Sequence, residues 1–218
     1  MLQFFGHPFS SYCQKALIAL YENDIPFAFR MIVPDQPDNG TLLAQLWPIG
    51  KFPVLEDDRW AVFEASIIVE HLQIQHPGPV RLIPDDPVMA LEVRLLDRFF
   101  DNHVATPQQK LVFDALRPEG QKDPAGVADA RAALDKAYAW LDAHMAGRTW
   151  VAGDAFSLAD CAAAPHLFYA HWSHPVPPGL RHVHAYRQRL LERPSFARAV
   201  KEARAWRPYF PLDGTPEE

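Results

Sequence analysis

The first third of the chain alternates between the two-residue hydrophobic period of strands and the longer period of helices. An apolar run at Leu2–Gly6 predicts a short buried strand, and Ser10 or Ser11 stands where the N-cap of a following helix is needed. That helix continues to Leu20, and residues 27–33 then alternate as a second strand. The order strand, helix, strand is the first prediction.

Two further strands and a helix complete this region. Phe52–Leu55 and Trp60–Phe63 flank an acidic turn and are predicted to form a hairpin. Residues 64–75 follow as a helix, which the sequence Pro77-Gly78-Pro79 ends. The elements have the order β-α-β followed by β-β-α, which is the order of a thioredoxin-like domain.

From residue 87 onward the periodicity is helical, and Asp86-Pro87 is a helix start. The fold class predicted is α+β: a thioredoxin-like domain over residues 1–76, a proline-rich linker over 77–86 and an all-helical domain over 87–218. Ser157 and Asp160 have the spacing of a capping box, with Phe156 and Cys161 at the staple positions. Two sets of residues each share one helical face: Leu91, Leu95, Phe99 and His103, and Ala133, Ala137, Trp140 and Leu141.

Composition narrows the classes of protein to consider. A chain of 218 residues with 49% hydrophobic residues can bury the core of one large domain or two small ones. The net charge of -6 gives no reason to expect a nucleic acid or an anionic membrane as partner. No apolar run spans a bilayer, the first residues lack the basic region of a signal peptide, and only two cysteines occur. These features predict a cytoplasmic protein with reduced thiols.

The segment before the hairpin contains a candidate binding site. Phe52 precedes Pro53, so its backbone is extended, and its N–H and C=O groups can pair with an extended peptide as a strand edge would. Glu64 and the N–H groups of Ala65 and Ser66 open the next helix, where one ammonium and one carboxylate are favoured. We predict a site for the backbone of a small zwitterionic peptide.

The segments Trp47–Leu55 and Phe63–Ile68 resemble the glutathione-binding half of the glutathione S-transferases, in particular the cytosolic, bacterial-type members that use a serine. Gly153–Asp160 and Arg193–Phe196 resemble features of that family's helical second domain, so the resemblance covers essentially the whole chain. It implies the glutathione S-transferase fold, a homodimer, a role in detoxification, and glutathione as cosubstrate without a metal.

The resemblance also implies which residues bind glutathione. In the family the proline is cis, the residue before it pairs with the cysteinyl part of glutathione, and a Glu-Ser pair holds the γ-glutamyl end. Here Ala65 replaces that Ser, which removes a hydrogen bond of about 1.5–3 kcal/mol, and the next residue, Ser66, is the candidate stand-in. Lys51 is the implied partner of the glycyl carboxylate. The implied glutathione-binding residues are Lys51, Phe52, Pro53, Glu64, Ala65 and Ser66.

The serines between the first strand and the first helix are the candidate catalytic residues. A thiol with a pKa near 8.5 needs about two units of depression, or roughly 2.7 kcal/mol, to be mostly thiolate at neutral pH. One charge-assisted hydrogen bond supplies about 1.5–3 kcal/mol and a helix N-terminus about 0.3–1 more, so one serine suffices. The resemblance implies Ser10, because tau-like and zeta-like transferases place their serine five residues before the basic residue of the first helix, which is Lys15 here. Theta-like members have a shorter spacing, which makes Ser11 the alternative or helper. A purely structural role as helix caps stays open for both serines.

The cysteines and histidines give weaker signals. Cys13 lies where a Cys-x-x-Cys motif has its second cysteine, but a cysteine one turn inside a helix is usually buried and inert, and Cys161 is predicted to be core. The histidines considered as metal ligands lack a completing cysteine pair or acidic residue, and prolines interrupt the helix that carries them, so no metal site is predicted. They are His166, His171, His174, His182 and His184.

The predicted function is transfer of glutathione to an apolar electrophile, with the protein stabilising the thiolate. The alternatives are a glutathione-dependent isomerase or peroxidase, and a non-catalytic partner-binding protein on the same fold, such as the starvation-response regulators. The isomerases carry an arginine where this chain has a tryptophan, which argues against a diacid substrate. The electrophile site is predicted at Phe9, Phe99, Asn102, His103 and Trp172.

Overall fold

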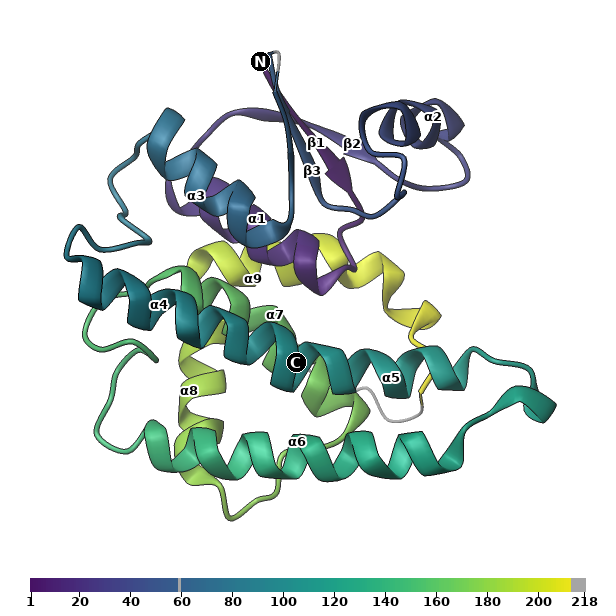
Figure 1. Ribbon diagram of the computed structural model, residues 1–218, viewed down its shortest axis with the longest axis vertical. Helices are drawn as coiled ribbons and strands as arrows, with labels where there is room; N and C mark the ends of the chain where they lie inside the picture. The colour runs from purple at the N-terminus through teal and green to yellow at the C-terminus, as the bar shows by residue number, and fades with distance from the viewer. Residues whose placement is uncertain (59, 213–218) are drawn as a thin grey trace.

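A four-stranded sheet with helices on both faces lies above a bundle of helices in the computed structural model of the chain (Figure 1), which describes residues 1–58 and 60–212. The strands are β1 (Leu2–Gly6), β2 (Phe27–Met31), β3 (Val54–Asp57) and β4 (Trp60–Phe63). Their order across the sheet is β2-β1-β3-β4, with β1 and β2 parallel and the other two pairings antiparallel. The predicted α+β class with a thioredoxin-like domain is confirmed.

Alternate residues of the strands face the two layers of helices. Phe4 and Leu55 point into the core formed with α1 (Ser11–Glu22) and α3 (Ala65–Gln75). Phe5 and Val54 face the other way and pack with Leu43. Leu43 belongs to α2 (Pro37–Leu46), a helix that the sequence analysis missed. Only two of its ten residues, Asn39 and Leu43, are buried, so its hydrophobic period is weak.

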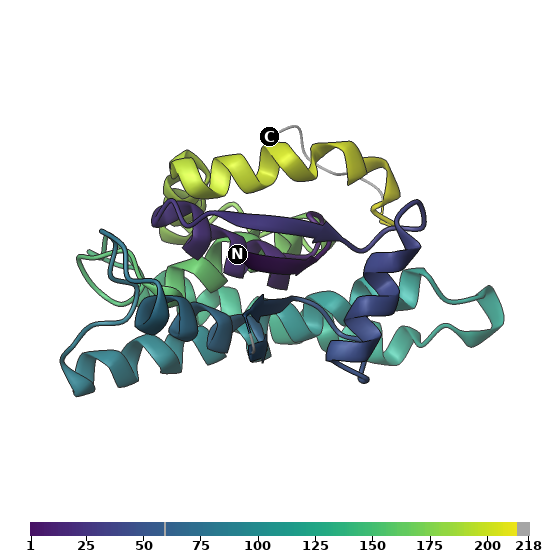
Figure 2. The ribbon, with the colours of Figure 1, turned by 90° about the horizontal axis from the view of Figure 1, so that it is seen from above.

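The helical half is built around α7, in which all sixteen residues except His171 are buried. α1 packs on α7, α3 and α9, so the sheet-bearing half rests directly on the bundle (Figures 1 and 2). α3 ends at Gln75 and α4 begins at Pro87; the exact domain boundaries stay a prediction. The α-helices of this half are α4 (Pro87–Phe99), α5 (Thr106–Ala115), α6 (Pro124–His144), α7 (Leu158–Ser173), α8 (Arg181–Glu192) and α9 (Pro194–Ala203).

Irregular helical turns also occur in this half. A π-helical turn, Phe100–Ala105, joins α4 to α5, so these segments form one long rod with a wider turn in its middle. The Thr106 hydroxyl donates to the Asp101 carbonyl oxygen at 3.0 Å inside that turn. Short 3₁₀ turns occur at Glu119–Gln121 and at Arg204–Tyr209.

The start of α7 is confirmed as a capping box. The backbone N–H of Ser157 donates to Asp160 Oδ2 at 2.9 Å, and the Asp160 carboxylate also accepts from the Val151 N–H and the Tyr186 hydroxyl. Asp160 is fully buried, so these donors offset the loss of water around its carboxylate. Phe156 and Cys161, at the staple positions, are 5% and 0% exposed.

One predicted apolar face of α4 is exposed in the chain. Leu91 and Leu95 are 67% and 66% exposed, whereas Val93 and Leu96 are buried toward α7. The helical period identifies the apolar faces of a helix but does not tell which of two adjacent faces is buried. In α4 the packing against α7 buries the face of Val93 and Leu96. In the second set, Ala137 and Leu141 are buried while Ala133 and Trp140 are exposed. Within the described residues, no helix combines the length and apolar character needed to cross a membrane.

Candidate functional site

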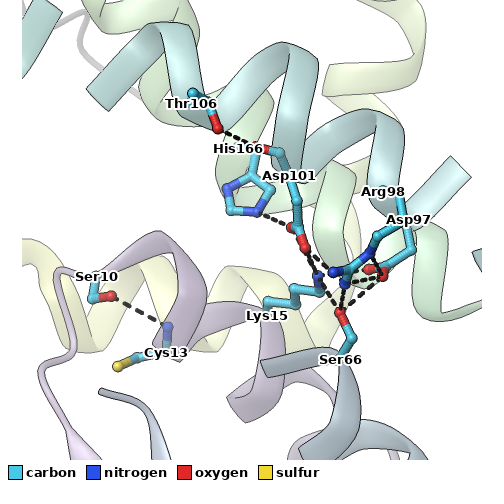
Figure 3. A network of polar contacts seen from close by, with 9 residues as sticks. All are labelled: Ser10, Cys13, Lys15, Ser66, Asp97, Arg98, Asp101, Thr106 and His166. Carbon is cyan, nitrogen blue, oxygen red and sulfur yellow. Dashed lines mark hydrogen bonds and ion pairs between the residues drawn. The ribbon is translucent and has the colours of Figure 1, made fainter. Parts of the chain in front are cut away.

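Ser10 stands at the N-cap of α1, directly after the loop that follows β1. Its Oγ accepts a hydrogen bond from the Cys13 N–H at 3.3 Å, and its backbone is extended, as an N-cap requires (Figure 3). The hydroxyl proton is not used in that bond, so it can be donated to an anion at the helix N-terminus. Ser10 is partly exposed, whereas Ser11, the first residue of the helix, is 8% exposed. The geometry therefore offers the Ser10 hydroxyl more readily than that of Ser11.

Cys13 is buried beneath this serine, as predicted. Its side chain is 0% exposed, and its Sγ accepts the His7 N–H at 3.4 Å. Burial raises the pKa of the Cys13 thiol to about 12, against the smaller opposing effects of the neighbouring Ser10 side chain and of the hydrogen bond from the His7 N–H. A thiol with that pKa is protonated at neutral pH and is a poor nucleophile.

The loop before β3 has the backbone geometry expected of a peptide-binding edge. The Phe52–Pro53 peptide bond is cis, as the resemblance implied. β3 begins at Val54, so Phe52 lies just outside the strand ladder, and no strand among the described residues pairs with its backbone groups. Pro53 is buried and Lys51 is exposed.

Glu64 lies at the N-terminus of α3 in an unusual backbone conformation. Its φ is +67°, a region that non-glycine residues rarely adopt and in which residues at binding sites are often held. The Glu64 side chain is exposed and makes no capping bond to the helix. The first N–H groups of α3, from Ala65 onward, have no partner within the helix and give this end a partial positive charge. The N-terminal end of α3 can therefore bind a carboxylate, while the Glu64 side chain binds an ammonium.

The Ser66 hydroxyl belongs to a buried network that joins the two halves of the chain (Figure 3). Lys15 Nζ donates to Ser66 Oγ at 2.9 Å and lies 2.6 Å from Asp97 Oδ1 and 2.8 Å from Asp101 Oδ1. Ser66 in turn donates to Asp97 Oδ2 at 2.8 Å. Arg98 contacts Ser66, Asp97 and Asp101 from the exposed side. The network was not predicted, and it commits the hydroxyl that was the candidate replacement for the serine missing at position 65.

Charges in this network balance each other. Two cations, Lys15 and Arg98, face the carboxylates of Asp97 and Asp101, and His166 Nε2 lies 3.0 Å from Asp101 Oδ1. Burial raises the pKa of the Asp101 carboxyl, but the hydrogen bond from His166 and the charge of Lys15 outweigh it and hold that pKa well below its usual range. Burial also lowers the pKa of His166 against the opposing effect of Asp101. Asp101 is thus ionised and held by both halves of the chain.

The residues predicted for the electrophile site fall into two groups. Phe9 lies 6.3 Å from Trp172 and 5.2 Å from Tyr169, measured between ring centroids. Phe99 contacts His103 and, at 4.4 Å, Trp140 of α6. Asn102 is exposed in the π-helical turn. A narrow pocket adjoins the first group only, and it is lined by Phe9, Phe168, Tyr169, Trp172, Val200, Ala203, Arg204 and Arg207.

The histidines of the helical half have partners other than a metal. His166 bonds Asp101, His171 Nδ1 accepts the Val176 N–H, and His174 bonds Asp135. His182 Nδ1 lies 3.1 Å from the Asp142 carbonyl oxygen, and His184 Nε2 lies 3.2 Å from the Pro177 carbonyl oxygen. The chain instead brings three other possible ligands together, Asp57, His71 and His76, which the sequence analysis did not consider.

Two family models match the chain. The model described as the N-terminal domain of glutathione S-transferase matches residues 4–80, and the model of the C-terminal domain matches residues 104–194. Among curated proteins, glutathione S-transferase GstB of Escherichia coli is 27% identical over 92% of this chain and 98% of its own length. The stringent starvation protein A homolog of Coxiella burnetii is 25% identical over 93% of each protein. A solved glutathione S-transferase from Methylobacterium radiotolerans, in complex with glutathione sulfonate, is 29% identical with a TM-score of 0.74, covering 91% of this chain and 94% of that one.

Proposed function

The chain belongs to the glutathione S-transferase family, and we propose that it is a working glutathione transferase in which Ser10 stabilises the thiolate of bound glutathione. The observation that carries this proposal is the placement of Ser10 at the N-cap of α1, with its hydroxyl proton available and partly exposed. A donated hydrogen bond to a thiolate and the partial charge of the helix end together supply about 2–4 kcal/mol. That range covers the roughly 2.7 kcal/mol that a two-unit depression of a thiol pKa requires.

Glutathione is proposed to lie along the loop before β3 and across the N-terminus of α3. The Phe52 backbone pairs with the cysteinyl residue, Glu64 binds the γ-glutamyl ammonium, and the first N–H groups of α3 bind its carboxylate. Lys51, exposed beside this loop, is the proposed partner of the glycyl carboxylate. Since the Ser66 hydroxyl is bonded to Lys15 and Asp97, Ser66 contributes its backbone N–H alone.

In the proposed reaction, the glutathione thiol loses its proton to solvent and the resulting thiolate accepts the hydrogen bond of Ser10. The sulfur lone pair then forms a bond to an electrophilic carbon, and the electron pair of the broken bond departs with the leaving group or moves onto an adjacent electron-withdrawing group. The protein supplies position and thiolate stabilisation, and the nucleophile comes from the cosubstrate. The proposed electrophile is apolar, because six of the eight residues that line the pocket beside Phe9 are aromatic or aliphatic.

The proposed enzyme acts in the cytoplasm as a homodimer. Apolar side chains on α3 and α4 support the second part of that proposal. Ile67, Ile74, Leu91 and Leu95 are all more than half exposed, and a large exposed apolar surface is typical of a subunit interface.

A non-catalytic, partner-binding role is the second candidate function. It is favoured by one observation, the alanine at position 65, which takes away a side-chain hydrogen bond from the γ-glutamyl carboxylate. The similarity to a stringent starvation protein A homolog also supports this second candidate. A module that bound only a protein partner would need the Ser10 hydroxyl as a helix cap alone.

The experiment that tests the proposal is a pH titration of the ultraviolet thiolate absorbance of glutathione bound to the protein. We expect the thiol of bound glutathione to ionise about two pH units below that of free glutathione. Ser10→Ala is expected to raise the pKa of the bound thiol by one unit or more, while the matched variant Ser11→Ala leaves it within a few tenths. Binding with an unshifted pKa, or no binding, would favour the non-catalytic function. A shift that is lost in Ser11→Ala instead would assign the role to Ser11.

A further inference from the structure

The only group of potential metal ligands found among the described residues lies at the far end of α3 from Glu64. Asp57 ends β3, His71 lies in the last two turns of α3, and His76 is the C-cap of that helix. The hairpin returns the end of β3 alongside the helix, so residues separated by 14 and 19 positions come together. The carboxylate oxygen and the two imidazole nitrogens all lie within 4.8 Å of one another.

Both imidazoles point the same nitrogen at one oxygen atom. His71 Nε2 lies 2.8 Å and His76 Nε2 lies 2.7 Å from Asp57 Oδ2, so both nitrogens converge on this carboxylate oxygen. By contrast, His174 Nε2 faces a single carboxylate, that of Asp135, and no third ligand joins that pair in the described part of the chain. Convergence of two nitrogens and one oxygen is the donor arrangement of many zinc sites with an open position.

The spacing of the three atoms fits a metal ion after a small adjustment. Zinc bound at about 2.0–2.1 Å to nitrogen and oxygen in a tetrahedron separates its ligand atoms by about 3.4 Å. The Asp57 oxygen therefore has to withdraw by roughly 0.6 Å from each nitrogen, which a rotation of its carboxylate accomplishes. The side chains of Asp57 and His71 are 16% and 15% exposed and that of His76 is 34% exposed, so the site is partly shielded and still open to solvent.

Room for a fourth ligand lies next to this cluster. An open pocket at the surface is lined by Asp57, Asp58, Trp60, His71 and Gln75. Asp57 and His71 both line it, so a metal held by the three ligands would have space for a water molecule on the pocket side.

We propose that Asp57, His71 and His76 bind a divalent transition-metal ion, with zinc as the ion of best fit and a water molecule as its fourth ligand. Two imidazoles and one carboxylate suit zinc, copper or nickel better than magnesium or calcium, which prefer oxygen ligands. Zinc would bind the lone pair of Nε2 in each imidazole, so each ring would carry its proton on Nδ1 when the ion is bound, and no redox step is needed. The ion would connect the end of β3 to the C-terminal end of α3, and the inference does not depend on glutathione chemistry.

The test uses the full chain without a histidine tag, titrated with zinc in competition with a chromophoric chelator. We expect one zinc ion per chain at micromolar or lower free zinc, and a loss of affinity of at least tenfold in His71→Ala and in His76→Ala. His174→Ala is the matched control, because it removes another imidazole bonded to a carboxylate, and its affinity should stay within about twofold of the wild type. The proposal would be overturned if the wild type failed to bind zinc with one-to-one stoichiometry. It would also be overturned if the His71 and His76 variants bound zinc as tightly as the wild type, or if the His174 variant lost as much affinity as they do.

A spectroscopic and a thermal readout keep the test independent of folding defects. Cobalt bound at the site should give the visible absorption of a tetrahedral or five-coordinate ion, absent in His71→Ala although its circular dichroism spectrum is unchanged. Zinc at about a hundredfold excess over its Kd should raise the Tm of the wild type by roughly 5–10 °C and that of His71→Ala by much less. An octahedral cobalt spectrum of the hydrated ion, or an equal rise in Tm in both proteins, would contradict the assignment.

Discussion

Replacing Lys15 with methionine removes a fully buried cation that joins the two halves of the chain. The Lys15 side chain is 0% exposed and its Nζ lies within 2.9 Å of Ser66 Oγ, Asp97 Oδ1 and both carboxylate oxygens of Asp101. Methionine has a similar volume and no charge, so the variant leaves packing nearly unchanged. It isolates the effect of leaving two buried carboxylates without their principal partner.

The expected loss of stability follows from the partners that remain. Removing one partner of a buried ion pair costs about 3–5 kcal/mol, because the other charge stays buried and uncompensated. Arg98 still contacts Asp97 and Asp101 and is half exposed, and His166 still bonds Asp101, so the lower end of that range applies. A loss of about 3 kcal/mol is a large part of the 5–15 kcal/mol that stabilises a typical protein.

Urea unfolding followed by circular dichroism measures this loss. With a dependence of about 3 kcal/mol per molar urea, we expect the midpoint of Lys15→Met to fall by about 1 M relative to the wild type. The control is Lys136→Met, which removes an exposed lysine of α6 and should shift the midpoint by less than about 0.2 M. A destabilisation of Lys15→Met below about 1 kcal/mol would refute the reasoning.

The pH dependence of the difference in unfolding free energy between the wild type and Lys15→Met tests whether this difference is electrostatic in origin. The pKa of Asp101 is depressed in the folded wild type, so its contribution to stability is present above the unfolded pKa of about 3.9 and is lost as the pH falls through the folded value. In Lys15→Met that depression is reduced, and protonation relieves the uncompensated charge. The gap in stability between the two proteins should therefore stay constant from about pH 7 to about pH 4 and narrow below about pH 4, because folded wild-type Asp101 takes up its proton at a lower pH than the same residue in the variant. A gap that stays constant as the pH falls well below about 4 would contradict a charge-based explanation.

Three further predictions follow from the site and the core. Ala65→Ser should restore the missing hydroxyl and tighten glutathione binding by about tenfold, measured by calorimetry, and an unchanged Kd would show that the α3 N-terminus is not the carboxylate site. Asp160→Ala should lower the free energy of unfolding by about 2–4 kcal/mol, because the Val151 N–H and the Tyr186 hydroxyl lose their buried acceptor; a loss below 1 kcal/mol in urea unfolding would argue against it. Cys13 and Cys161 should react with a thiol reagent only after denaturation, because both are 0% exposed, and rapid reaction of the native protein would contradict their burial.

Local sequence patterns were sufficient to predict most of the fold. The strands around the acidic turn and the start of α7 follow from short-range signals, namely alternation, prolines and a capping box, and each was predicted within two residues. α2 was missed because only Asn39 and Leu43 are buried, which is too little to produce a helical period. The orientation of α4 was also missed, since Leu91 and Val93 are equally apolar and only packing against α7 distinguishes them.

Two clusters of the structure could not be predicted from the sequence for a different reason. Lys15 and Asp101 are 86 positions apart, and nothing in the apolar segment around Lys15 indicates where its counterions lie. Asp57 and His76 are 19 positions apart and meet only because a hairpin and a helix return the chain on itself. The sequence does contain one signal for the network around Asp101, namely Lys15 itself. A charged residue within a buried helical segment requires a partner of opposite charge.

The buried network has a consequence for how such a chain can change during evolution. Lys15 and Ser66 belong to the sheet-bearing half, and Asp97, Asp101 and His166 belong to the helical half (Figure 3). A chimera that joined either half to the opposite half of a relative lacking these groups would inherit a charge without its counterion. Recombination between relatives is therefore constrained to exchange both halves together, or to replace the lysine and its aspartates in concert.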